Sequence, residues 1–262
     1  MIKGGNDVLL DTASIVTFGG VITLPFLFFL PLPSPASWPY IFGSIALHGA
    51  YYFLMINAYR TGDLSLVYPL MRGVAPLITA VLGIILLREL PAPISWLGML
   101  MISFGVIALA MRPAGGAPVL AGHERAVGFA LANAAVIAAY TIVDGTGARL
   151  SGNAWAYIAW LFVLDSIPFG IYMLATAPQS FATGLIERRW RGLIGGALSA
   201  VAYAISVWAM TKAPVALVAS LRETSVLFAT LIGARLLKER LTPRRWVGVG
   251  AVLIGVVALK AA

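Results

Sequence analysis

The sequence contains no cysteine and few charged residues, and both absences narrow the kinds of protein it can encode. Without cysteine there are no disulfides, thiolate metal sites or cysteine nucleophiles. Asp, Glu, Lys and Arg make up 11% of the 262 residues, whereas soluble domains carry roughly 25%. Because so few ionised groups cannot cover the surface of a soluble globule, a soluble enzyme, a disordered chain and a nucleic-acid-binding module are poor interpretations.

What the chain has in abundance is apolar sequence, at 60% of residues and a mean hydropathy of +0.93. A membrane-spanning helix needs roughly 20 apolar residues, and the runs are too continuous for barrel strands. We therefore predict an all-α membrane protein, with connections such as 177–191 between its helices. Nine transmembrane helices are expected, near 11–30, 39–59, 65–87, 93–111, 126–148, 154–176, 190–210, 215–237 and 243–261.

The chain also repeats itself at a fixed offset of 150 residues. The matched positions include tryptophan, a rare residue type, and an arginine inside a predicted span in each half. The pairs are Arg72 with Arg222, Glu89 with Glu239, Trp96 with Trp246, Gly98 with Gly248, and Gly105 with Gly255. We predict a first repeat over 1–112, a linker over 113–125 and a second repeat over 126–262.

The offset gives the second repeat five helices and the first repeat four. The partner of the helix at 126–148 would precede Met1, so we expect that a first helix is missing from this chain. A start assigned too late, a shortened chain and a true nine-helix variant would each explain this. In the ten-helix form, an odd number of helices per half would place the halves in opposite orientations, as an inverted repeat.

Both halves carry the same junction, Leu86-Leu87-Arg88-Glu89-Leu90 before Trp96-x-Gly98, and Leu236-Leu237-Lys238-Glu239-Arg240 before Trp246-x-Gly248. This pattern resembles EamA-type members of the drug/metabolite transporter superfamily. The resemblance implies ten helices in two five-helix repeats, and a multi-pass protein of a bacterial cytoplasmic (inner) membrane. It also implies a carrier, in particular an exporter, of small organic metabolites that works by alternating access.

In relatives the first helix lines part of the central cavity. The alternative is therefore a non-transporting membrane subunit, or a truncated and inactive transporter fragment. The expected partners are a small-molecule substrate and the lipid bilayer, with a homodimer left open. No cofactor, metal site or enzyme constellation is expected, since the chain has two histidines and lacks a His-Glu-x-x-His motif, a serine elbow and a phosphate loop.

Ionisable residues inside spans are costly and are therefore functional candidates. Arg72 and Arg222 lie seven or eight residues into their predicted helices, roughly 10 Å deep at 1.5 Å per residue. Either guanidinium could bind a substrate carboxylate or phosphate. The alternative is that each reaches the headgroups or neutralises a structural acid.

Neutral hydrogen bonds to a substrate are expected from a small set of polar side chains, with aromatic packing or an interfacial belt as the alternative. These candidates are Tyr52, Tyr203, Tyr68 and Asn57. A coupling proton is expected on Glu223, Asp165 or Asp144. Glu223 adjoins Arg222, but successive helix residues do not face each other, so its partner must lie elsewhere. Asp144 is close to the end of its predicted helix, which favours a plain interfacial role, and His48 is predicted to be a packing residue more readily than a proton relay.

Overall fold

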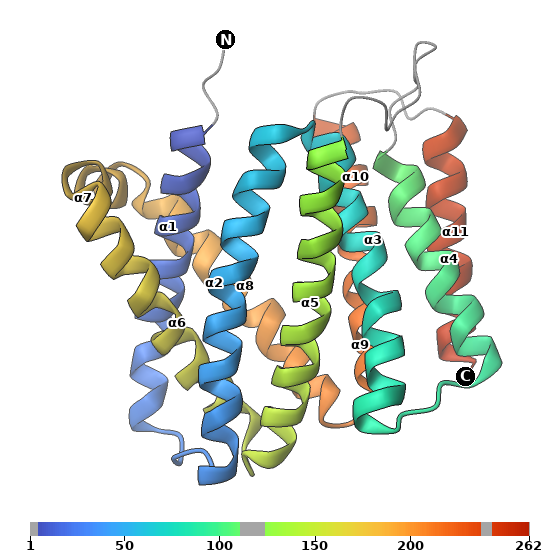
Figure 1. Ribbon diagram of the computed structural model, residues 1–262, viewed down its shortest axis with the longest axis horizontal. Helices are drawn as coiled ribbons and strands as arrows, with labels where there is room; N and C mark the ends of the chain where they lie inside the picture. Colours follow the sequence, from blue (N-terminus) through green and yellow to red (C-terminus); the bar gives the residue numbers. More distant parts are fainter. Residues whose placement is uncertain (1–4, 111–123, 237–242, 262) are drawn as a thin grey trace. The chain divides into compact units, whose positions relative to one another are not determined.

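The computed structural model describes residues 5–110, 124–236 and 243–261, and every regular element within these ranges is a helix (Figure 1). The first part of the chain forms α1 (Gly5–Thr23), η1 (Leu24–Phe28), η2 (Pro35–Ser37), α2 (Trp38–Thr61), α3 (Leu64–Leu82), η3 (Gly83–Leu87) and α4 (Pro93–Ala110). The second part forms α5 (Glu124–Leu150), α6 (Ala154–Thr176), α7 (Pro178–Glu187), α8 (Arg189–Met210), α9 (Val215–Arg222), α10 (Ser225–Leu236) and α11 (Pro243–Lys260).

Seven segments of the described chain are long and apolar enough to cross a membrane, and each coincides with a predicted span. α4 is apolar but shorter, and α11 carries three basic residues in its 18. The all-helical class is thus confirmed for the described residues, while the count of nine spans stays a prediction. The repeated junction at Lys238 and Glu239, and all but the last two residues of the linker at 113–125, lie outside the described ranges.

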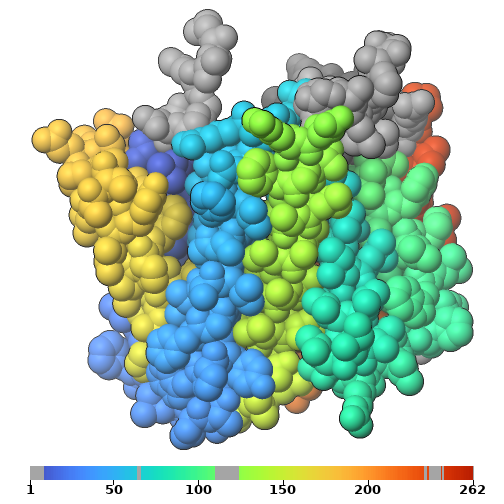
Figure 2. Space-filling view, viewed as in Figure 1, coloured from blue at the N-terminus to red at the C-terminus, as the bar shows by residue number. Residues whose placement is uncertain are grey.

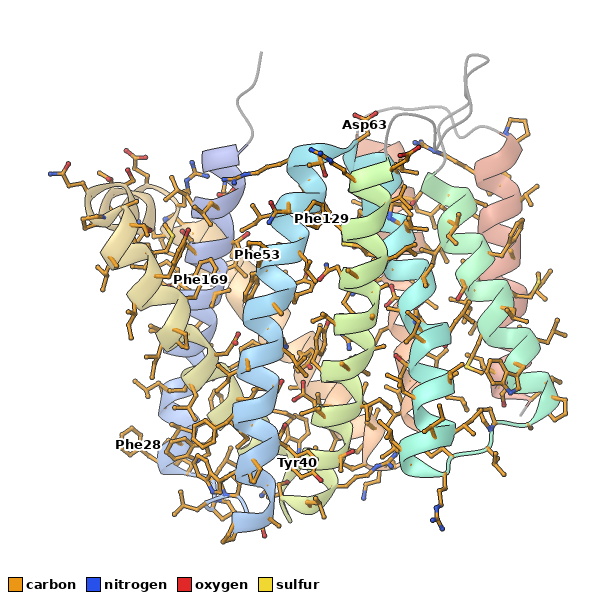
Figure 3. The ribbon with its side chains drawn as sticks, in the orientation of Figure 1. Phe28, Tyr40, Phe53, Asp63, Phe129 and Phe169 are labelled. Atoms are coloured by element: carbon orange, nitrogen blue, oxygen red, sulfur yellow. The ribbon has the colours of Figure 1, made fainter. Side chains whose placement is uncertain are left out.

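Large apolar side chains point outward from the middle of the helices, as expected for contact with lipid. On α6, Ile167, Ile171 and Leu174 recur every three or four residues and are 48%, 61% and 57% exposed; Figure 2 shows the outer face of this helix in yellow. At the end of η1, Phe28 is 84% exposed and projects away from the helices (Figure 3). A helix that is apolar around its whole circumference and exposed in this way is typical of a membrane span.

The chain divides into two compact units, whose boundaries fall inside α2 and α5. The first unit comprises Met1–Gly49 and Val143–Lys212, and the second comprises Ala50–Ile142 and Ala213–Ala262. Each unit therefore contains segments from both predicted repeats. The repeats are defined by sequence similarity and the units by compactness, so the predicted division at 113–125 stays a prediction.

In the first unit, α1 packs along α8 and α6. One correction to the sequence prediction arises here, because the expected connection at 177–191 contains a helix, α7. It begins with Pro178, whose fixed φ suits a first helical turn. Phe181 is buried against Ala13 of α1 and Met173 of α6, which gives this short helix a core to pack on.

In the second unit, α4 and α11 lie side by side (Figure 1) in the most extensive contact between two helices. Glycines allow their backbones to touch. A Cβ on Gly105 would lie 2.7 Å from the Gly248 carbonyl oxygen, and one on Gly255 would lie 2.7 Å from the Gly98 carbonyl oxygen. Gly248 and Gly255 therefore form a close contact surface on α11, whereas Gly250 faces open space.

The predicted span at 215–237 also needs correction, because it is not continuous. α9 ends at Arg222, α10 begins at Ser225, and the backbone between them forms turns. The amides of Glu223 and Thr224 donate to the carbonyls of Ser220 and Leu221, three residues back, at 3.1 Å each. Such tight turns mark a break in the α-helical ladder. The break places Glu223 between two half-helices.

Candidate functional site

An ion pair occupies the helix break in the second unit. Arg72 of α3 places its Nε 2.8 Å from Oε2 of Glu223, and the two side chains are 20% and 5% exposed. Their angles do not meet those of a hydrogen bond, so attraction between the charges is the main interaction. An ionised carboxylate buried at this depth needs a cation beside it. The pair supplies the partner that the sequence required for Glu223 outside its own helix.

Local sequence explains why each charge is held where it is. Arg72 lies in α3 between Pro69 and Pro76, each of which removes a backbone hydrogen bond from the helix. On the other side of the pair, the hydroxyls of Ser220 and Thr224 donate to the carbonyls of Ala216 and Leu221. Side-chain hydrogen bonds of this kind compete with the helical ladder. Both charges therefore come from irregular or strained stretches of their spans.

Several phenols are electrostatic neighbours of the guanidinium of this pair. Tyr51, Tyr68 and Tyr140 are close enough to Arg72 to interact with it electrostatically. The Tyr51 and Tyr140 rings meet edge to face at 6.0 Å, and Tyr52 packs on Tyr51 with ring centroids 5.2 Å apart. Among the predicted substrate residues, Tyr68 is thus an electrostatic neighbour of Arg72. Tyr52 is connected to Arg72 only through its ring contact with Tyr51.

The remaining predicted residues of the second unit have different surroundings. Arg222 closes α9 and interacts electrostatically with Glu223. Asn57 donates its amide to the Phe53 carbonyl of its own helix at 2.8 Å. Arg222 therefore belongs to the electrostatic surroundings of the ion pair, whereas the hydrogen bond of Asn57 is local.

The repeated junction residue Glu89 anchors the start of α9. Its Oε2 accepts the amide of Val215, the first residue of that helix, at 2.8 Å. Glu89 follows Arg88, which has a left-handed φ of 56° after the π-helical turn η3. The carboxylate also interacts favourably with the helix N-terminus. This contact ties the segment that follows η3 to the half-helix that leads to Glu223.

Glu89→Ala is expected to lower the free energy of unfolding by about 1–2 kcal/mol, because it removes a charged acceptor from a helix N-terminus. Glu89→Gln keeps an acceptor oxygen and should lose less. Thermal unfolding of the two variants in the same detergent measures the difference. Equal losses would mean that charge, rather than the hydrogen bond, provides the stabilisation.

A second set of polar residues, the polar cluster, lies in the first unit and consists of His48, Asp144, Tyr157, Asp165 and Tyr203. Asp144 is completely buried. Its Oδ1 accepts the Tyr157 hydroxyl at 2.8 Å, and its Oδ2 accepts the Tyr203 hydroxyl. The interfacial role expected for Asp144 is wrong, because its side chain is completely buried and accepts hydrogen bonds from tyrosines of α6 and α8.

The rest of the polar cluster joins α2 to α6. Nδ1 of His48 lies 3.2 Å from Oδ1 of Asp165, and both side chains are 14% exposed. The His48 ring also meets Tyr203 edge to face at 6.3 Å. Contacts therefore run from Asp165 through His48 and Tyr203 to Asp144. Asp165 contacts the imidazole directly and Asp144 is connected to it through Tyr203, so the cluster brings two carboxylates and an imidazole into one chain of contacts.

The predicted residues thus separate between the two units. Arg72, Arg222, Glu223, Tyr52, Tyr68 and Asn57 belong to the second unit, and Asp144, Asp165 and Tyr203 to the first. Tyr157 was not among the predicted residues, because a tyrosine in an apolar helix carries no signal of the carboxylate that it contacts. No group of three or more metal-ligating side chains is positioned to hold a metal among the residues described.

Comparisons with known proteins agree with this architecture. The sequence model of the EamA-like transporter family matches residues 9–111 and 125–260. A solved structure, described only as a crystal structure of a protein, superposes with a TM-score of 0.73 at 17% sequence identity. The match covers 97% of this chain and 87% of that one, and shows a shared fold. No match was found among curated proteins. With almost its whole length matched, the chain belongs to the EamA-like transporter family, within the drug/metabolite transporter superfamily.

Proposed function

We propose that this membrane protein exports small organic metabolites by alternating access. The observation that carries the proposal is the Arg72–Glu223 ion pair at the break between α9 and α10. Carriers bind substrates where spans are discontinuous, because unwound backbone and half-helix ends offer polar groups inside the membrane. Here the break additionally places Glu223 against the cation of Arg72, which has phenols among its electrostatic neighbours.

Arg72 is the group we assign to an anionic part of the substrate. A guanidinium can bind a carboxylate or phosphate through two parallel hydrogen bonds, and in this structure its Nε lies against Oε2 of Glu223. A substrate anion would compete with Glu223 for the cation. Tyr68 and Tyr52 would then orient the solute, and Arg222 would add positive potential beside it.

The glycine contacts of α4 and α11 support an inverted repeat. At the offset of 150, Gly98 corresponds to Gly248 and Gly105 to Gly255. The observed contacts join Gly98 to Gly255 and Gly105 to Gly248. Each glycine therefore contacts the repeat equivalent of the other glycine on its own helix. A two-fold axis between the repeats would produce this pattern. Alternating access would follow from movement of one repeat against the other.

The defining experiment removes both charges of the pair together. Arg72→Gln/Glu223→Gln leaves no unpaired charge in the membrane, so we expect a folded protein. The purified protein is reconstituted into liposomes that contain a labelled amino acid, organic acid, amine or sugar. The release of the labelled solute from the liposomes is then measured. The wild type should move at least one class with saturation, and the double variant should lose that flux.

The matched control is Asp11→Asn/Arg188→Gln, which removes a different ion pair with an N–O distance of 2.5 Å. Asp11 is 44% exposed, and this pair lies outside the proposed substrate site. Its flux should stay at the wild-type level. A wild-type protein that moves no member of the panel would contradict the carrier and favour the non-transporting membrane subunit.

For the coupling ion, we propose a proton bound within the polar cluster, on Asp144 or Asp165. Asp144→Asn keeps the shape of the side chain but cannot exchange a proton. Accumulation driven by a pH gradient should fall to its level without a gradient, whereas substrate exchange at equal pH should continue. Glu187→Gln, on the exposed end of α7, is the control. Gradient-driven transport that survives in both Asp144→Asn and Asp165→Asn would contradict this assignment.

A further inference from the structure

A polar pocket at the ends of three helices of the first unit takes no part in the ion pair or the polar cluster. Its volume is about 400 Å³, and it lies where α5 and α8 end and α6 begins (Figure 1). Its walls contain two cations, Arg149 and Lys212, and two indoles, Trp155 and Trp208. None of the described residues that line it is acidic. The pocket is thus suited to an anion.

Hydrogen bonds hold the walls of this pocket in place. Nε of Arg149 donates to the Met210 carbonyl at 2.8 Å, which joins the end of α5 to the end of α8. Asn153 caps α6 by accepting the amides of Trp155 and Ala156 at 3.0 and 3.2 Å. The positive end of the α6 dipole therefore faces the same region as the two cations. The positive potential of Arg149 and of the α6 N-terminus therefore belongs to a wall that hydrogen bonds hold in place, and Lys212 adds an exposed cation beside it.

The two tryptophans indicate the depth of the pocket relative to the bilayer. The indoles of Trp155 and Trp208 stack at 6.3 Å with 22° between their planes, and they are 46% and 41% exposed. Both lie close to the ends of apolar spans. Exposed tryptophans at such positions are enriched at the headgroup level of membranes. An anion bound here would therefore be at the depth of lipid phosphates.

We propose that this pocket binds the phosphate of an anionic phospholipid headgroup. Arg149 and Lys212 contact the phosphate, and the stacked indoles pack on the glycerol and upper acyl chain. Basic pockets between transmembrane helices bind anionic headgroups in this way. None of the residues that line the pocket belongs to the ion pair or to the polar cluster, so this proposal does not depend on whether the protein carries solutes.

Fluorescence quenching tests the proposal, because the stacked indoles report on a lipid beside them. The protein is placed in nanodiscs that contain brominated phosphatidylglycerol or, as reference, brominated phosphatidylcholine. The variant Trp155→Phe/Trp208→Phe isolates the signal of this pair from the other tryptophans. Wild-type protein should show stronger quenching by phosphatidylglycerol at equal mole fraction.

Charge removal should abolish that preference. Each basic residue near a membrane surface contributes about a fivefold preference, so Arg149→Gln/Lys212→Gln should weaken it about 25-fold. Lys212→Gln alone should weaken it about fivefold; among the described residues this exposed side chain has no ion pair or hydrogen bond, so folding is not at risk. The control Arg189→Gln/Lys260→Gln removes the same charge from exposed positions elsewhere.

Three outcomes would overturn the proposal. Equal quenching by the two lipids would show that the pocket does not select an anion. An equal loss in the control would show that net charge, rather than this pocket, attracts the lipid. Suppression of the preference by glycerol 3-phosphate at millimolar concentration would show that the site takes soluble phosphates instead of lipid.

Discussion

Arg72→Gln alone is expected to destabilise the protein by about 3–5 kcal/mol, because it leaves the carboxylate of Glu223 buried without its cation. Glu223 is 5% exposed and its Oε2 lies 2.8 Å from the lost guanidinium. Arg222 interacts with the same carboxylate, but it cannot replace a partner in direct contact. Unfolding of the purified protein in mixed micelles, followed by circular dichroism, measures the loss.

The double variant Arg72→Gln/Glu223→Gln should recover most of that stability. Neutral amides cost far less to bury than a lone charge, and two of them can bond to each other. A double-mutant cycle then gives an interaction energy of about 2–3 kcal/mol, as for residues in direct contact. Additive losses in the cycle would mean that the two charges do not depend on each other.

The exposed pair of the first unit provides the contrast. Asp11 is 44% exposed, so water screens its interaction with Arg188. Breaking this pair by Arg188→Gln should cost less than about 1 kcal/mol. The charges are in direct contact in both ion pairs, so the greater exposure of Asp11 is the reason for the smaller expected effect.

Features governed by composition could be predicted from the sequence. A helix must satisfy its backbone within itself inside a membrane, so the predicted spans at 65–87, 126–148 and 154–176 coincide with α3, α5 and α6. The depth of Arg72 follows from its place in such a span, and so does the expectation that it is functional or neutralises an acid. The structure shows the neutralising contact.

Contacts between helices could not be predicted in the same way. The sequence indicates that Glu223 must find its partner on another element, but only packing brings Arg72 to it from 151 positions away. Asp144 was misjudged because its burial comes from contacts with tyrosines of other helices, which its place along α5 does not reveal. The break at Glu223 was missed because apolar residues on both sides hide it from a hydropathy pattern.

The second large effect on stability is expected from enlarging a glycine at the contact between α4 and α11. Gly105→Leu is expected to destabilise the protein by about 3 kcal/mol, since overpacking a close contact forces the backbones apart. A Cβ at this position would already lie 2.7 Å from the Gly248 carbonyl oxygen, and backbone cannot move aside as a flexible side chain can. The same micelle unfolding assay applies.

Glycine-to-alanine substitutions test this backbone contact, because the contact determines whether the added methyl group raises or lowers stability. In an ordinary helix interior, glycine to alanine stabilises by about 1 kcal/mol. Gly250→Ala, on α11 with no atom within 4 Å of its added Cβ, should show that gain. Gly105→Ala should lose stability despite the better helix propensity, and Gly255→Ala should lose a similar amount because its contact with Gly98 has the same length of 2.7 Å. If Gly105→Ala matched Gly250→Ala, α4 and α11 would not be in backbone contact. Unequal effects at Gly105 and Gly255 would argue against the two-fold relation that the sequence repeat implies.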